Sequence, residues 1–196
     1  MMAFESLKQE HWMKMVQKKS KEICFELMIF LTTAVIFAAG CTQVPVNVSL
    51  PENIDVSTLQ VVSSQDQTGV PVEGNFTLTR ADSRPFMVVV SSGDIPVAMT
   101  LVLPGREDNQ VSCLDTAVAL VLVRTGLATA PDNLKADLID HVKSVTAVKD
   151  MANAICTALA SDITAVANPD TELKNTLLGA EQEVLNHLKL LSSQPG

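Results

Sequence analysis

Few side chains in this sequence have the types and spacing that chemistry requires, and the clearest candidates are two histidines. His141 lies four residues after Asp137 and next to Asp140, so Asp137 and His141 share a face if this segment is helical. Such a face could begin a metal site, but zinc needs three or four ligands, including thiolates or further histidines. HExxH, paired CxxC and calcium-loop spacings are absent. We therefore expect no bound metal, with His141 on a solvated helix face and His187 near an exposed helix end.

Other catalytic arrangements are also missing from the sequence. No serine stands in a GxSxG or SxxK motif, and no GxxxxGK[ST] phosphate-binding loop occurs. Glu107 and Asp108 lie in a predicted loop, while Glu181 and Glu183 are two residues apart and point to different sides of a helix. The sequence therefore predicts a protein that is not an enzyme and carries no cofactor.

The composition narrows the class of protein further. The chain has 196 residues, of which 47% are hydrophobic and 18% charged, so it can bury enough apolar surface for an ordered fold. A net charge of −8 argues against a nucleic-acid partner, because binding phosphates requires a basic surface. Aromatic residues make up only 4% of the chain, which argues against base-stacking platforms and aromatic ligand sites.

The first forty residues have the pattern of a targeting segment. Five lysines precede Leu27–Ala39, a run of thirteen residues without a charge. A membrane-spanning helix needs about 20 apolar residues, whereas thirteen is the length of the apolar part of a signal peptide. The run ends in the small residues Ala38, Ala39 and Gly40, and Cys41 follows directly.

The segment Phe37–Cys41 resembles the cleavage motif of bacterial lipoprotein signal peptides, with Ala38 where that family usually has leucine. In that family the cysteine thiol receives a diacylglycerol and the peptide is cut before it. The resemblance therefore implies a signal peptide over residues 1–40, lipid attachment at Cys41 and a membrane-bound location in the cell envelope. Thr42, which is not aspartate, implies outer-membrane attachment facing the periplasm if the source is Gram-negative. An ordinary cleaved signal and an uncleaved anchor remain the alternatives.

Beyond Cys41 the pattern becomes that of extended structure. Residues 41–55 predict a tether, because Thr42–Pro51 combines two prolines with alternating valines; an edge strand is the alternative. Residues 56–104 predict a small antiparallel β-sandwich, because short β-rich runs follow one another at about ten-residue spacing with turn residues between them. The runs are Ser57–Ser63, Val70–Arg80, Pro85–Ser91 and Pro96–Leu103.

Two short segments carry weaker resemblances. Gly69–Asn75 (GVPVEGN) resembles the turn-and-strand opening of transthyretin-like and carboxypeptidase-regulatory-like β-domains. That likeness implies a structural or interaction module. Asp115–Val121 resembles the first helix of uncharacterised secreted bacterial proteins in which a small β-domain precedes helices, with Asp115 where their pattern has serine. The second likeness implies architecture alone.

Residues 112–191 predict a bundle of three to four helices, after a polar break at residues 104–111. Ser112–Val123 is nearly all apolar and favours a buried helix, although its β-branched residues leave a central strand open. Apolar residues at three- and four-residue spacing predict amphipathic helices over Pro131–Val145, Val148–Val166 and Asp170–Leu191. The predicted fold class is therefore α+β.

Cys113 and Cys156 are the remaining cysteines after Cys41, and both lie on predicted helices. An exported protein can form a disulfide between them, which would stabilise the fold by closing a long loop. Because both neighbourhoods are apolar, two separate buried thiols are the alternative.

The last predicted helix carries two leucines outside its main apolar stripe, Leu178 and Leu185, which are seven residues apart and so share nearly one face. They either widen the core-facing surface or form an exposed surface for a partner or a second copy. The sequence predicts a non-catalytic lipoprotein with an interaction or scaffold role, whose partners are the membrane and an envelope protein. The alternative is a carrier of an aliphatic ligand, which requires an enclosed apolar cavity of about 300 Å³ or more.

Overall fold

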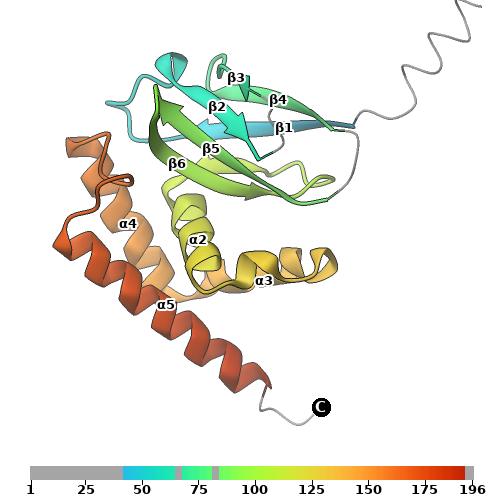
Figure 1. Ribbon diagram of the computed structural model, residues 1–196, viewed down its shortest axis with the longest axis vertical. Coiled ribbons are helices and arrows are strands. Elements are labelled where there is room, and N and C mark those ends of the chain that lie inside the picture. Colours follow the sequence, from blue (N-terminus) through green and yellow to red (C-terminus); the bar gives the residue numbers. More distant parts are fainter. Residues whose placement is uncertain (1–41, 65–67, 81–83, 193–196) are drawn as a thin grey trace, which may run out of the picture. The chain divides into compact units, whose positions relative to one another are not determined.

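The computed structural model describes residues 42–64, 68–80 and 84–192. The predicted signal peptide and Cys41 lie outside these residues. Thr42–Gly196 forms one compact unit. Its described part has the α+β architecture that the sequence predicts, with strands in two small sheets followed by four helices (Figure 1).

The strands occupy the first half of this unit and the α-helices the second half. The strands are β1 (Thr42–Ser49), β2 (Gln60–Ser63), β3 (Thr68–Gly69), β4 (Asn75–Arg80), β5 (Phe86–Ser92), β6 (Ile95–Val102) and β7 (Gln110–Ser112). The helices are α2 (Cys113–Arg124), α3 (Asp132–Ser144), α4 (Thr146–Ser161) and α5 (Thr171–Ser192), with short 3-10 helices η1 (Val56–Thr58) and η2 (Leu127–Thr129).

Strand β1 is the central strand of a three-stranded sheet, so the predicted tether is wrong for these residues. It pairs antiparallel with β4 and parallel with β7. Its valines Val44, Val46 and Val48 are buried, while the residues between them are exposed. The alternation that suggested an extended chain is that of a strand with one face in the core. Strand β7 likewise lies partly within the predicted polar break.

The geometry of β1 explains how it accommodates Pro45. The amide of Asn47 donates to the carbonyl of Asn109 on the β7 side, whereas the amide of Val48 donates to the carbonyl of Gly74 on the β4 side. Amides alternate along a strand, so the nitrogen of Pro45 faces the β7 side. Strand β7 pairs only with Asn47 and the two residues after it, so proline removes no ladder hydrogen bond there.

The second sheet has the order β3-β2-β5-β6, and its strands pair antiparallel. Val61, Val88, Val90 and Val97 from these strands are fully buried. The turn between β3 and β4 places Glu73 and Gly74 at positive φ, with reciprocal backbone hydrogen bonds between Val72 and Asn75. Positive φ at both central residues is the requirement of the type I′ turn that suits a hairpin.

Helix α2 joins the sheets to the other helices, and the strand alternative for this segment is wrong. Ser112 caps the helix by accepting a hydrogen bond from the amide of Asp115 at 3.2 Å. The hydroxyl of Thr116 donates to the carbonyl of Ser112 and accepts from the amide of Met99 on β6. Gly126, at φ 77°, follows the end of the helix. The apolar faces of α2 therefore pack against strands on one side and helices on the other.

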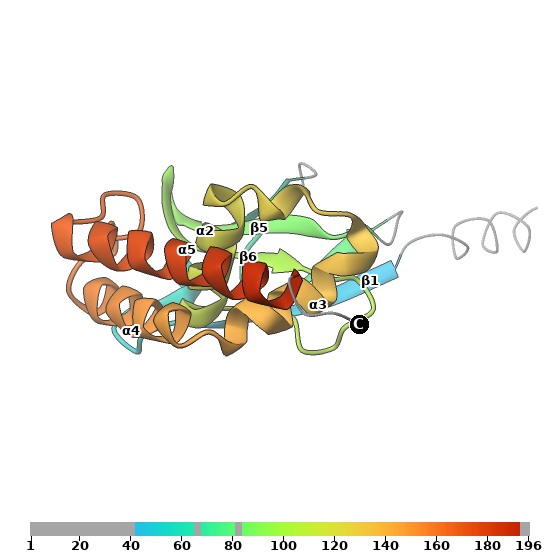
Figure 2. The ribbon, with the colours of Figure 1, turned by 90° about the horizontal axis from the view of Figure 1, so that it is seen from below.

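The remaining helices follow the predicted segments with one difference. Helix α4 ends at Ser161, five residues before the predicted end at Val166. Asp162 stops it by accepting a hydrogen bond from the amide of Thr164, a local turn that competes with helix. Figure 1 shows the helices on one side of the sheets, and Figure 2 shows α5 nearest the viewer, on the side of α2 and α4 that faces away from the strands. One continuous apolar core joins strands and helices.

Candidate functional site

Helix α5 presents one apolar face to the core and a second, smaller one to solvent. Leu173, Leu177, Ala180 and Val184 are buried against the other helices. Leu178 and Leu185 lie outside that buried face and keep 52% and 41% of their surface exposed. The sequence left two alternatives for these leucines, a wider core-facing surface or an exposed surface, and the structure has the exposed one. We call Leu178 and Leu185 the α5 stripe.

An ion pair between α5 and α2 borders the α5 stripe. Glu181 lies three residues after Leu178 and four before Leu185, and its carboxylate pairs with Arg124 at the end of α2. The stripe therefore runs along the side of α5 that faces the end of α2. Val123, next to Arg124 in sequence, is itself 51% exposed.

Charged residues bound the α5 stripe along the helix axis. Lys174 lies one turn before Leu178, and Lys189 lies one turn after Leu185; both are exposed. The stripe is thus a short apolar strip with a cation at each end, on a chain whose net charge is −8.

Cys113 and Cys156 form a disulfide between the start of α2 and the second half of α4, with Cα atoms 5.6 Å apart. Of the two alternatives drawn from the sequence, the bonded pair is therefore the one present. The bond ties the beginning of the helical half to its middle, and it is far in sequence from the α5 stripe.

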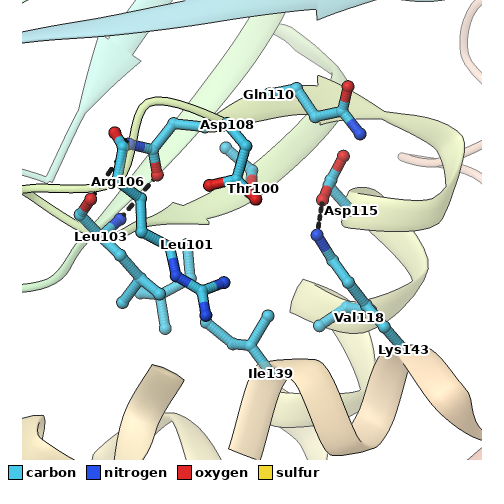
Figure 3. A pocket seen from close by; sticks show the side chains of 11 residues that line it. Thr100, Leu101, Leu103, Arg106, Asp108, Gln110, Asp115, Val118, Ile139 and Lys143 are labelled. Carbon is cyan, nitrogen blue, oxygen red and sulfur yellow. Dashed lines mark hydrogen bonds and ion pairs between the residues drawn. The ribbon is translucent and has the colours of Figure 1, made fainter. Parts of the chain in front are cut away.

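A small polar crevice separates the loop after β6 from α2 and α3 (Figure 3). Asn109, which is buried, closes the loop: its amide nitrogen donates to the carbonyls of Leu103 and Arg106, and its oxygen accepts from the amide of Leu103. The crevice has a volume of about 20 Å³, which is room for about one water molecule. It is too small for a substrate.

Two ion pairs bound this crevice. Arg106 binds Asp140 through two hydrogen bonds of 2.9 and 2.5 Å, and this interaction lowers the pKa of Asp140 and raises that of Arg106. The second pair joins Asp115 to Lys143 at 2.8 Å. All four charges are matched, so these groups hold elements together rather than offering a free acid or base.

A larger groove lies between the second half of α4 and the start of α5. Its volume is about 440 Å³ and it is open to solvent. Its lining mixes alanines and Leu173 with hydroxyl, amide and carboxylate groups, including Asp162, Asp170 and Glu172. The enclosed apolar cavity that an aliphatic-ligand carrier requires is therefore not what this groove provides.

The structure brings His141 and His187 together, which the sequence interpretation did not foresee. Their ring centres are 4.6 Å apart with an angle of 51° between the ring planes, although the residues lie on α3 and α5. Both side chains are partly buried, so the expectation of two solvated helix positions is wrong. No signal in one sequence could have paired two residues so far apart. Asp140, beside His141, instead points to Arg106.

Within residues 42–192, apart from the two short gaps, no group of three or more His, Cys, Asp or Glu side chains is arranged to hold a metal ion. In the same residues no helix is long and apolar enough to cross a bilayer. Cys41, the predicted lipidation site, lies outside the described residues.

No protein-family model matches the chain, and neither the curated proteins nor the solved structures give a match.

Proposed function

We propose that this chain is a lipid-anchored protein of the bacterial cell envelope that binds another envelope protein through the α5 stripe and catalyses no reaction. The anchor rests on the resemblance of Phe37–Cys41 to a lipoprotein cleavage motif. The binding role rests on one observation: Leu178 and Leu185 are exposed together on a helix whose other apolar face is already buried.

Docking would bury apolar surface that both leucines of the α5 stripe leave exposed. Burying a leucine side chain fully is worth about 1.5 to 3 kcal/mol, and each of these leucines has roughly half of that still to gain. Lys174, exposed at the start of the stripe, favours a partner whose apolar groove has an acidic rim. A helix face of this kind suits docking into a groove on another protein.

The carrier function has less support. The groove beside α4 exceeds the roughly 300 Å³ that a small ligand needs, but it is open and has three carboxylate residues in its lining. An aliphatic chain would leave those carboxylates unpaired or exclude their water, which costs free energy. We therefore place binding on α5 ahead of ligand carriage.

The test is site-specific photo-crosslinking in intact envelopes. A photoreactive residue at Leu178 or Leu185 should give one discrete adduct, whereas the same residue at Asn175 or Asn186, exposed elsewhere on α5, should give none. The double variant Leu178→Lys/Leu185→Lys should abolish the adduct made from a reporter at Lys174, which is exposed one turn before Leu178. The control Asn175→Lys/Asn186→Lys adds equal charge to the same helix and should preserve it.

Each other outcome contradicts part of the proposal. An adduct with twice the mass of the chain identifies a second copy as the occupant and removes the envelope partner. Crosslinks of equal strength from all four α5 positions, or from none, remove the α5 stripe as a docking surface. Unfolding of the double lysine variant, read by circular dichroism, would place these leucines in the core.

A further inference from the structure

We propose that His141 and His187 form a binding site for a divalent transition metal ion of the zinc type, at the contact between α3 and α5. This site is independent of the anchor and of the α5 stripe. It uses two histidines that are 46 positions apart in the sequence and belong to different helices, yet have their rings side by side.

The first support is an unexplained polar atom. The Nε2 atom of His141 is buried and has no hydrogen-bond partner among the described residues. A buried polar atom without a partner costs free energy, and a bound ion or water is one way in which a native protein satisfies such an atom. The neighbouring imidazole of His187 supplies the second donor that an ion would need.

The second support is the geometry of the two rings. A nitrogen lone pair lies in the plane of its imidazole, so an ion bound by two rings must lie in both planes. Parallel stacked rings cannot satisfy this condition, whereas planes inclined at 51° meet along a line. Two imidazoles that bind one ion through nitrogens about 2 Å away hold their ring centres roughly 5 Å apart. The observed separation of 4.6 Å is close to that value.

The ligand set defines the kind of metal. Two imidazoles suit zinc, copper and nickel, and are a poor choice for calcium or magnesium, which prefer oxygen. Because no third His, Cys, Asp or Glu joins the pair in the described residues, water must complete the coordination. Asp137 and Glu183 each lie one helical turn before a histidine and favour a cation nearby without binding it. Such a site is exchangeable rather than structural.

The experiment measures Zn²⁺ binding to the full chain in detergent, without a histidine tag and with free thiols blocked by N-ethylmaleimide. We expect equilibrium dialysis to show one Zn²⁺ that is lost, or bound at least about tenfold more weakly, in His141→Gln and in His187→Gln, because each removes one of two ligands. Asn186→Gln, which changes an exposed residue next to His187, is the matched control and should bind as the unaltered protein does.

A second readout tests the location of the ion. Zn²⁺ should raise the Tm of the unaltered protein and of the Asn186→Gln variant, since it binds where two helices meet in the folded state. It should leave the Tm of the two histidine variants unchanged. Circular dichroism verifies that each variant is folded, and either histidine variant alone decides the result. Equal Zn²⁺ binding by all four proteins, or no rise in Tm for the unaltered protein, would show that the two rings pack without a metal.

Discussion

The carboxylate of Asp115, in the first turn of α2, lies 2.8 Å from the ammonium nitrogen of Lys143 in the last turn of α3 (Figure 3). Asp115 is 5% exposed, and it also accepts a hydrogen bond from the hydroxyl of Ser112. The pair therefore joins two helices at the point where α2 leaves β7. It is the most deeply placed carboxylate among the described ion pairs.

Loss of the lysine should be costly because it leaves a buried carboxylate without its cation. We expect Lys143→Met to lower the free energy of unfolding by about 2 to 4 kcal/mol. Adding Asp115→Asn should recover part of this loss, because the buried charge is then removed as well. Urea denaturation of the two single variants and the double variant measures the coupling; strictly additive losses would show that the residues do not interact.

The Arg106–Asp140 pair should make a small contribution that depends on pH. Hydrogen bonding to Arg106 holds the pKa of Asp140 below its usual value of 3.8. The stabilisation is therefore complete above the unfolded-state pKa and is lost as the pH falls through the lower folded-state pKa. Since Asp140 is 53% exposed, it should be worth less than about 1 kcal/mol. Arg106→Ala should raise the pKa of Asp140 in an NMR titration; an unchanged titration would contradict the pairing.

Two neighbouring leucines on α5 should respond differently to truncation. Leu177 is 9% exposed, whereas Leu178 is 52% exposed. Leu177→Ala should lower the free energy of unfolding by about 2 to 4 kcal/mol, because it leaves a cavity in the core. Leu178→Ala should cost less than about 0.5 kcal/mol, as surface substitutions do. Chemical denaturation measures both values, and losses of equal size would contradict the orientation of α5.

The disulfide should be a major source of stability. It joins residues 43 apart in sequence, and closing a loop of that length constrains the unfolded chain by about 4 kcal/mol. The double variant Cys113→Ala/Cys156→Ala should lose up to that amount in urea denaturation. Mass spectrometry after alkylation of the unreduced protein should find neither of these thiols modified; a label on both would mean that the bond does not form in the cell.

Lipid attachment at Cys41 is testable directly by mass spectrometry. Protein extracted from membranes should begin at Cys41 and carry a diacylglyceryl group, because Ala38, Ala39 and Gly40 provide the small residues that precede the cysteine. Cys41→Ser should leave the precursor uncut or release the protein. Recovery of the unaltered protein in the soluble fraction with an unmodified start would refute the anchor.

The helices were predictable because their signals are local. The cap at Ser112, the stop at Gly126 and the spacing of apolar residues on α5 all act within a few residues. The segment of β1 was predicted as a tether, with an edge strand as the alternative, because Thr42–Pro51 contains two prolines. Whether Pro45 is tolerated within a strand depends on which neighbouring strand its nitrogen faces. That information resides in the pairing and not in the segment.

Long-range contacts account for the rest of what the sequence did not reveal. The contacts of His141 with His187 and of Asp115 with Lys143 depend on how the helices cross. Neither composition nor residue spacing predicts that crossing. The α5 stripe was predicted as one of two alternatives because Leu178 and Leu185 lie outside the main apolar face of the predicted helix. Only the packing of α5 against α2 and α4 decides whether these two leucines are buried or exposed.

The position of β1 limits how far from the membrane a protein anchored at Cys41 can extend. Thr42 already pairs with Arg80 in the sheet, and consecutive Cα atoms are only about 3.8 Å apart. If Cys41 carries the lipid, no linker separates the lipidated residue from the first strand, so the domain stays close to the membrane surface. A compact unit of this size is roughly 40 Å across. The α5 stripe can then meet only proteins within that height of the same membrane, at a high effective concentration.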